Sequence, residues 1–380
     1  MFHTNQTKAS SGILSAFNAG VRYALLRALC QSGKTGTFQN LIQRMLNTEN
    51  ITHAYILCGS SETELKKQAV NDTLTFNSDF YQKGLIQVLF HQDFLEATLD
   101  IQNALIVIDE SHMVQTKGQQ LHQFLLNHGI KMDGDPTVLK EKNAYVLSVD
   151  ATPYSELATL VMGETPHEKH VEDLLPGTGY YGLADYDREY RLLSTFSISK
   201  EPERFEELLI SMPAKYVLMR LTRSKSNEAN EAELRRICKR NHFPVLLYTG
   251  EKTQVAMTLS EQERYLRKGH HLPCLEIAPA VTTVVIVRGR LRAGKVVPKV
   301  HMGFIWEGAT KSKTDALVQG LPGRMCGYVF SDVKPLLFVP PTALVPDELA
   351  RVLSDELPKT ATNMRASAMT NGQSVFSVDI

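Results

Sequence analysis

A short glycine-containing segment near the N-terminus has the residue types that bind phosphate groups. Residues 28–35 read ALCQSGKT, which fits the phosphate-loop pattern with alanine in place of the first glycine. An apolar run precedes the segment and a helical pattern follows it, as the pattern requires. Lys34 would reach the terminal phosphates, and the Thr35 hydroxyl would coordinate Mg²⁺. Glycine lets backbone N–H groups curl around phosphate oxygens, and the helix start attracts the anion.

The alternative to a phosphate loop is an ordinary strand–turn–helix connection. The expected phosphate-binding residues are Gln31, Ser32, Gly33, Lys34, Thr35 and Gly36.

Two adjacent carboxylates follow a hydrophobic run further along the first half. Residues 105–112 read LIVIDESH. Asp109 would hold Mg²⁺ through water, and Glu110 would orient and deprotonate an attacking water. His112 would pair with the next motif and link the two halves of the chain. A plain solvated turn would not explain why two acids follow a phosphate loop at a fitting distance.

A third segment closes the last strong apolar run of the first half. Residues 148–153 read SVDATP. Thr152, two residues after Asp150, would hydrogen-bond His112 and report the state of the nucleotide. Taken alone, this segment also fits a simple turn.

A fourth segment lies in the second half of the chain. Residues 319–328 read QGLPGRMCGY. Arg324 would act as an arginine finger on the γ-phosphate, a role worth roughly 10³–10⁵ in rate in related phosphoryl-transfer enzymes. Gln319 would touch that phosphate or the attacking water. The alternative is a glycine-rich turn with a solvated Arg324.

In their order along the chain, these four segments resemble the motifs of superfamily 2 helicases of the DEAD/DExH-box type. The resemblance spans roughly residues 6 to 330, and the second motif takes the form DESH. The ending GRMCGY is similar to divergent viral or phage members. One extra residue separates Gln319 from Arg324, and Tyr328 stands near the place of the family's second arginine. Either Arg324 alone is the finger, or Arg292 shares the role.

The resemblance implies further contacts. Gln6 lies upstream of the phosphate loop, where many relatives place a glutamine that reads adenine. Arg288, Arg290 and Arg292 lie in the densest basic stretch, which would bind nucleic-acid phosphates; the alternative is a solvated hairpin between two strands. The full set of residues that the resemblance places on nucleic acid is Ser60, Ser61, Arg223, Arg288, Arg290 and Arg292.

Apolar runs that alternate with helical segments predict an α/β chain with largely parallel sheets. The resemblance implies two RecA-like P-loop NTPase domains, each a mostly parallel sheet flanked by helices. The expected boundaries are an ATP-binding domain at 1–165, a linker at 166–195, a second domain at 196–345, and a helix with a loose tail at 346–380. The abrupt ending at Ile380 is consistent with a fragment of a longer protein.

The composition limits the class of protein. Lys plus Arg equals Asp plus Glu, at 41 each, so only a local basic groove would bind nucleic acid. The five cysteines form no CxxC pair, which favours a reducing compartment. No apolar run approaches the ~18 residues of a membrane span, and no signal peptide is evident. We therefore expect a soluble, intracellular protein of the cytoplasm, nucleus or a viral replication site, with no membrane partner. A zinc site is a minor alternative, on loosely spaced Cys238, His242, His270, His271 and Cys274.

These patterns together predict an ATP- and Mg²⁺-dependent helicase or translocase acting on single-stranded or duplex nucleic acid, with DNA favoured over RNA. A protein partner could supply specificity. One rival is a DNA-packaging or restriction-type translocase ATPase, although no carboxylate-rich nuclease cluster follows Asp332. A second is a catalytically silent nucleic-acid-binding scaffold, which the intact Lys34, Asp109 and Glu110 disfavour. A small-molecule kinase would leave the second half unexplained.

Overall fold

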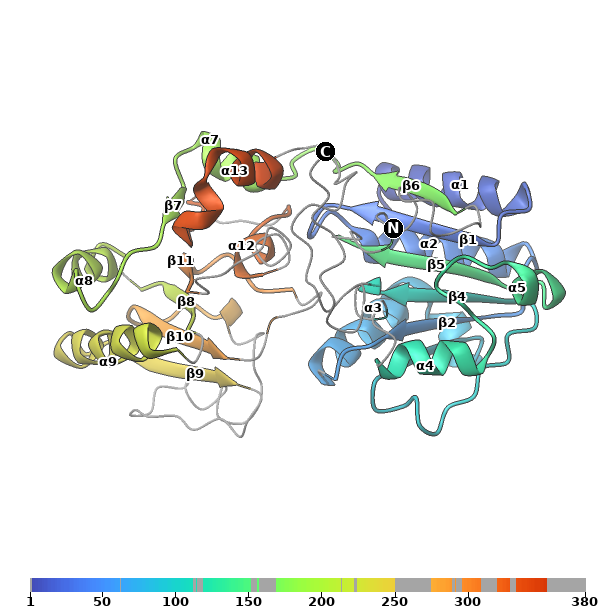
Figure 1. Ribbon diagram of the computed structural model, residues 1–380, viewed down its shortest axis with the longest axis horizontal. Coiled ribbons are helices and arrows are strands. Elements are labelled where there is room, and N and C mark those ends of the chain that lie inside the picture. Colours follow the sequence, from blue (N-terminus) through green and yellow to red (C-terminus); the bar gives the residue numbers. More distant parts are fainter. Residues whose placement is uncertain are drawn as a thin grey trace. The chain divides into compact units, whose positions relative to one another are not determined.

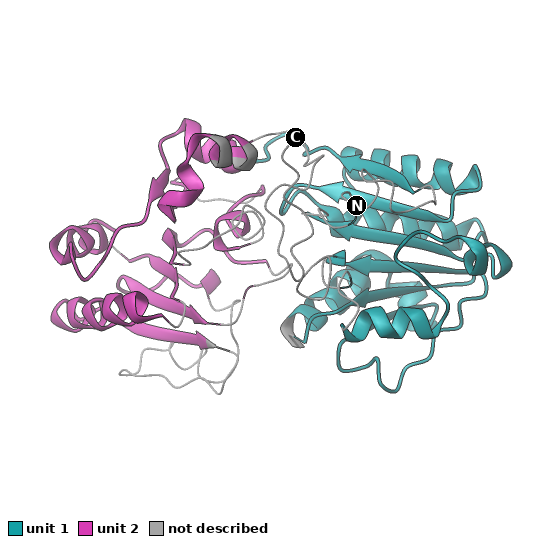
Figure 2. Ribbon diagram, in the orientation of Figure 1, with its two compact units in different colours: residues 1–180, 356–380 teal, residues 181–355 magenta. Residues whose placement is uncertain are grey.

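The chain forms two compact units, residues 1–180 with 356–380 and residues 181–355 (Figure 2). Each unit contains one six-stranded sheet, and every pairing between its strands is parallel. The prediction of an α/β chain with two parallel sheets is therefore confirmed. The computed structural model describes residues 2–61, 63–111, 114, 119–151, 156, 169–212, 214–221, 224–249, 275–288, 291, 296–308, 320–328 and 333–353.

The first sheet holds the phosphate loop after β1 and the acidic motif after β4, with β5 between these two strands (Figure 1). Its strands, in order across the sheet, are β3 (Ile86–Phe90), β2 (His53–Cys58), β4 (Ala104–Asp109), β5 (Tyr145–Asp150), β1 (Tyr23–Ala28) and β6 (His170–Leu174). The described helices of this unit are α1 (Thr4–Asn18), α2 (Lys34–Asn47), α3 (Thr63–Gln82), α4 (Gln120–Asn127) and α5 (Thr137–Glu141). Because all strands run the same way, the loops that follow β4, β5 and β1 meet at one edge.

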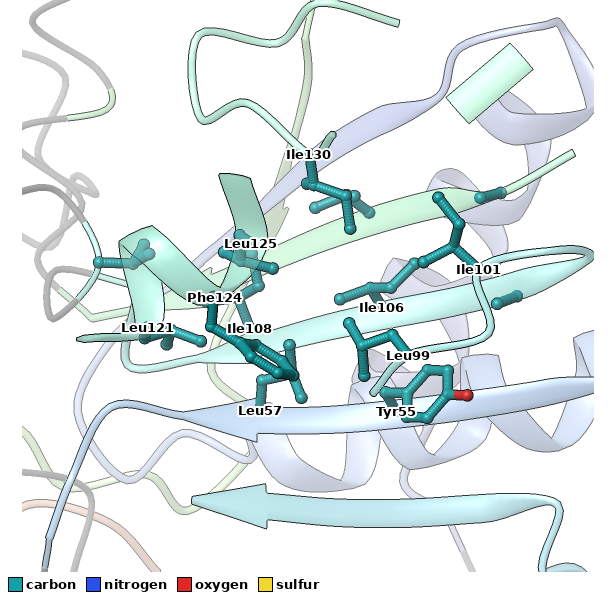
Figure 3. Close-up of a cluster of buried hydrophobic side chains, with 14 of the residues drawn as sticks. Tyr55, Leu57, Leu99, Ile101, Ile106, Ile108, Leu121, Phe124, Leu125 and Ile130 are labelled. Carbon is teal, nitrogen blue, oxygen red and sulfur yellow. The ribbon is translucent and has the colours of Figure 1, made fainter. Parts of the chain in front are cut away.

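A hydrophobic cluster covers one face of this sheet (Figure 3). Strand β4 contributes Ile106 and Ile108, and α4 contributes Leu121, Phe124 and Leu125 at helical spacing. All five side chains are buried. Central parallel strands are buried on both faces, which is why β4 reads as a continuous apolar run.

The second sheet has its own core. Its strands, in order, are β7 (Leu192–Ser194), β12 (Leu336–Val339), β11 (Met302–Glu307), β8 (Tyr216–Arg220), β10 (Thr283–Arg288) and β9 (Val245–Thr249). The described helical elements are α7 (Leu183–Arg188), α8 (Pro202–Ile210), α9 (Lys225–Arg240), α12 (Leu321–Arg324), the 3₁₀ helix η3 (Pro341–Leu344) and α13 (Pro346–Leu353). Trp306 is stacked on Phe338, with ring centroids 5.0 Å apart, and meets Phe205 edge-on at 5.4 Å. Strand β8 lies between β10 and β11, so these two strands do not form the hairpin considered as an alternative.

The expected linker, 166–195, instead supplies an edge strand to each sheet: β6 pairs with β1, and β7 pairs with β12. Strand β6 reads HVEDL, and only its last residue is buried. An edge strand needs little apolar surface, so the run lacks the pattern that marks the central strands. An ion pair between Arg27 and Asp173, 2.6 Å apart, ties β6 to β1.

Helix α4 provides a test of the first core. Phe124→Ala should lower the free energy of unfolding by about 3–5 kcal/mol, because it removes a buried ring that stacks on Phe94 at 4.8 Å. Chemical denaturation would measure the loss. Leu126→Ala on the same helix is the control, because that side chain is exposed and its loss should change stability by no more than about 0.5 kcal/mol. Equal losses for the two variants would contradict the packing described.

Candidate nucleotide-binding site

The phosphate loop connects the end of β1 to the start of α2. Gln31 and Gly33 have φ angles of 61° and 109°, in the left-handed region that favours glycine. Both the backbone N and the Oγ of Ser32 donate to Leu29 O, at 3.3 and 2.8 Å, which closes the loop. The first N–H groups of α2, beginning at Lys34, have no acceptor within the helix. A turn of this kind at a helix start is a binding place for an anion.

Gln6, the residue expected to read adenine, packs against this loop. Its Nε2 donates to Gly33 O at 3.1 Å, and its Oε1 accepts from His3 N at 2.9 Å. A Cβ added at Gly36 would overlap the same amide. The observed contacts make Gln6 a brace between α1 and the phosphate loop, and its contact with adenine stays a prediction.

Tyr180 also supports this loop, although no sequence pattern marks it. Its hydroxyl donates to Cys30 O at 2.7 Å. The residue lies 150 positions from its acceptor and belongs to no recognisable motif. Only the fold brings it to the phosphate loop.

The acidic residues gather at the same edge of the sheet. Asp109 ends β4 and Asp150 ends β5, and β5 lies between β4 and β1 in the sheet. Glu110 is 3% exposed, has a φ angle of 56°, and donates its backbone N–H to Asp109 Oδ1 at 3.1 Å. The predicted acids are therefore brought together with the phosphate loop.

The charges of these groups alter one another's pKa values. Burial alone would lower the pKa of Lys34, but Glu110, followed by Cys30, Asp150 and Asp109, raises it above its ordinary value. Burial, followed by the charge of Glu110, raises the pKa of Asp109 to about 7, with a smaller contribution from Asp150 and an opposing one from Lys34. Lys34 is thus a firmly protonated cation, and the nearby acids repel one another.

The link between the second and third motifs takes a form that was not expected. Ser111 Oγ donates to Glu156 Oε2 at 2.9 Å, and Asp150 Oδ2 lies 3.4 Å from the same hydroxyl. The expected bond joined Thr152 to His112, which both lie outside the described residues. In the described part of the chain, Ser111 carries the connection.

The expected nucleic-acid and second-unit residues are placed as follows. Ser61 is exposed after β2, whereas Ser60 is 2% exposed. Arg288 forms an ion pair with Glu231 of α9. Arg324 ends the short helix α12 and is 2% exposed. The remaining predicted residues, Arg223, Arg290, Arg292 and Gln319, lie outside the described residues.

The minor zinc alternative receives no support from Cys238. This thiol lies in the second hydrophobic core, where burial raises its pKa to about 12. His270, His271 and Cys274 lie outside the described residues. Within the described part of the chain, no three His, Cys, Asp or Glu side chains are grouped to hold a metal ion. No described helix is long and apolar enough to cross a membrane.

Known structures share this fold. No protein-family model and no curated protein matches the chain. Dbp5 of S. cerevisiae bound to RNA and ADP BeF3 is 12% identical, with a TM-score of 0.56 over 93% of this chain and 92% of that one. The DEAD-box helicase Mss116 bound to ssRNA and UDP-BeF is 15% identical, with a TM-score of 0.54 over 93% and 77%. The DUF1998 helicase MrfA bound to DNA is 14% identical, with a TM-score of 0.52 over 94% and 49%.

The chain shares its two-domain fold with these helicase structures. Its two sheets correspond to the two RecA-like domains of these structures, which confirms the expected fold.

The first unit also fits a nucleotide with its metal ion. The Thr35 hydroxyl and the Asp109 carboxylate are oxygen donors of the kind that Mg²⁺ prefers. Lys34 and the start of α2 supply positive charge for phosphate. The donor set is therefore suited to a magnesium nucleotide.

Asp109 makes the nucleotide-free protein sensitive to pH. Its pKa is about 7 when folded and near 4 when unfolded, so the folded state binds more protons between these values. Its contribution to stability is therefore present below about pH 4 and is lost as pH rises to about 7.

Asp109→Asn should gain stability relative to the wild type as pH rises from 4 to 7, measured by denaturation without Mg²⁺. The exposed Asp79→Asn is the control. A pH-independent difference between Asp109→Asn and the wild type would refute the raised pKa.

Proposed function

We propose that the chain is an ATP-dependent helicase or translocase that couples Mg-ATP hydrolysis to movement on, or unwinding of, nucleic acid. The observation that carries the proposal is the charge cluster at the carboxyl edge of the first sheet. There the charges of Glu110, Asp150 and Asp109 raise the pKa of Lys34, which begins α2. The fold supports the same function, because the structures of like fold include proteins bound to RNA, to DNA and to nucleotide analogues.

In the proposed reaction the first unit binds the triphosphate. The N–H groups at the start of α2 and the ammonium of Lys34 hold its phosphate oxygens. Thr35 and Asp109 would hold Mg²⁺, which neutralises charge on the phosphates when bound. Glu110 orients water and accepts its proton as the oxygen attacks the γ-phosphorus. Gln6 and Tyr180 keep the loop in shape through Gly33 O and Cys30 O.

The second unit would supply the remaining positive charge. In this proposal Arg324 stabilises charge on the γ-phosphate during hydrolysis, and Gln319 touches that phosphate or the attacking water. Movement of the two units with each cycle would shift the nucleic acid along its track. Ser61, Arg288 and the basic residues near it would contact the nucleic-acid backbone, and Arg288 would have to exchange its bond to Glu231 for a phosphate.

A catalytically silent scaffold is the rival function. A scaffold needs the fold but has no use for a buried carboxylate placed beside a magnesium ligand. Glu110 is 3% exposed and holds a left-handed backbone angle of 56°. Both features are costly for a glutamate without a chemical role. They favour the enzyme.

Glu110 provides the direct test of catalysis. Glu110→Gln should lower the kcat of ATP hydrolysis by roughly 10²–10⁴, because the amide keeps the size of the side chain but accepts no proton. Binding of a fluorescent ATP analogue with Mg²⁺ should be retained. Glu141→Gln, an exposed change in the same unit, is the matched control. An unchanged kcat in Glu110→Gln would remove Glu110 from the mechanism.

The substrate class is tested with the wild type and Lys34→Ala. ATP hydrolysis should rise when single-stranded DNA, single-stranded RNA or duplex is added, and the most effective of these names the track. Lys34→Ala should abolish hydrolysis, since the ammonium no longer meets the phosphates. If pure wild-type protein hydrolyses no ATP under any of these conditions, the scaffold is the better explanation.

A further inference from the structure

A chain of buried polar side chains leads away from the candidate site. Ser111 directly follows Glu110, and its Oγ donates to Glu156 at 2.9 Å and lies 3.4 Å from Asp150 Oδ2. Glu156 forms an ion pair with Lys169, with Oε1 and Nζ 3.4 Å apart. The side chains of Lys169 and Glu156 are 0% and 1% exposed. We call Ser111, Glu156 and Lys169 the Ser111–Lys169 network.

The far end of the network is anchored beside the first strand. Lys169 donates to Met132 O at 2.5 Å and lies 4.3 Å above the ring centroid of Tyr23. The Tyr23 hydroxyl is 3.1 Å from Ser148 Oγ. Burial, and next the charge of Glu156, raises the pKa of Tyr23 well above its ordinary value, so this hydroxyl stays protonated. Ser148 is two residues before Asp150 on β5 and shares its face of the sheet, so the path returns to the site.

A buried ion pair is an expensive way to stabilise a protein. Removing two charges from water costs several kcal/mol per ion, and apolar residues of like size are often as stable or more so. The pair lies on the face of the sheet that otherwise carries the apolar cluster around Ile106 and Phe124. Glu156 and Lys169 therefore call for an explanation other than packing.

The backbone next to the pair supplies one. Glu110 adopts a left-handed φ of 56°, a conformation that a non-glycine residue keeps only when its surroundings enforce it. Ser111 is its covalent neighbour, and the bond from Ser111 to Glu156 fixes the peptide that follows the glutamate. Lys169 in turn holds Glu156 in the position that accepts this bond.

We propose that Glu156 and Lys169 are positioning residues that hold Ser111, and through it the Glu110 carboxylate, in the geometry for hydrolysis. Neither residue lies in the four motifs read from the sequence. The inference rests on the proposed function. It adds a support that links the ends of β4 and β5 to the start of β6.

Ser111→Ala tests the link with little change in volume. The kcat of ATP hydrolysis should fall by at least about tenfold while the KM for ATP changes by less than about twofold, because small displacements of a catalytic group affect the transition state. Ser10→Ala is the matched control: Ser10 is also fully buried and hydrogen-bonded in the same unit, but away from the acids. Equal kcat values for Ser111→Ala and the wild type would overturn the proposal.

A second comparison separates positioning from stability. Lys169→Met alone leaves Glu156 buried without its counter-charge and should lower the melting temperature. Adding Glu156→Leu removes the stranded charge, so the double variant should recover stability but not kcat, because leucine accepts no bond from Ser111. Recovery of kcat together with stability would show that the pair is only structural. Should the double variant fail to fold, Ser111→Ala decides.

Hydrogen exchange provides a readout that needs no hydrolysis. In the nucleotide-free protein, Ser111→Ala should speed amide exchange at residues 109–111 and leave β2 unchanged, whereas Ser10→Ala should do neither. If the wild-type protein has no ATPase activity, the proposed function is refuted, but the positioning role of the Ser111–Glu156 bond is not. If the wild type is active and Ser111→Ala changes neither the exchange rates nor kcat, only the positioning role is refuted.

Discussion

The electrostatic attraction between one lysine ammonium and three carboxylates is the interaction on which the first unit depends. Glu110, Asp150 and Asp109 raise the pKa of Lys34 at the edge where β1, β4 and β5 end. With all groups ionised, the cluster has more negative than positive charge. Burial makes that excess costly, which is why Asp109 gives up its charge near pH 7. A divalent cation would neutralise the excess negative charge and favour the ionised form of Asp109. The acids are therefore suited to a nucleotide that arrives with its cation at the phosphate loop.

The rest of the unit can be understood as support for that cluster. In the observed contacts, Gln6 and Tyr180 donate hydrogen bonds to backbone carbonyls of the phosphate loop. Ser111 ties the acidic motif to Asp150, and the buried pair behind it continues the tie to β6. A charged site gains selectivity and rate when its dipoles are fixed before the reaction, because no energy is then spent on reorganising them.

The sequence predicted the centre of this arrangement far better than its supports. Central parallel strands such as β4 must be continuously apolar, and the motifs sit where those strands end, so both strands and motifs could be read directly. Strand β6 and helix α1 were missed because an edge strand and a polar helix leave weak patterns. Lys169 and Tyr180 are single residues whose partners lie 13 and 150 positions away, and only folding brings them together.

The strand ends of the second unit follow a different electrostatic rule. Arg220 ends β8 and pairs with Glu307, which ends the neighbouring β11, at 3.0 Å. Arg288 ends β10 and pairs with Glu231 of α9. Among the described residues, both arginines at these strand ends therefore already have a carboxylate partner, and Glu231 is shared with Arg235. A nucleic-acid phosphate at Arg288 would therefore compete with an existing carboxylate. Binding there would be weaker and more selective than binding to an unpaired arginine, because the ion pair must be broken first.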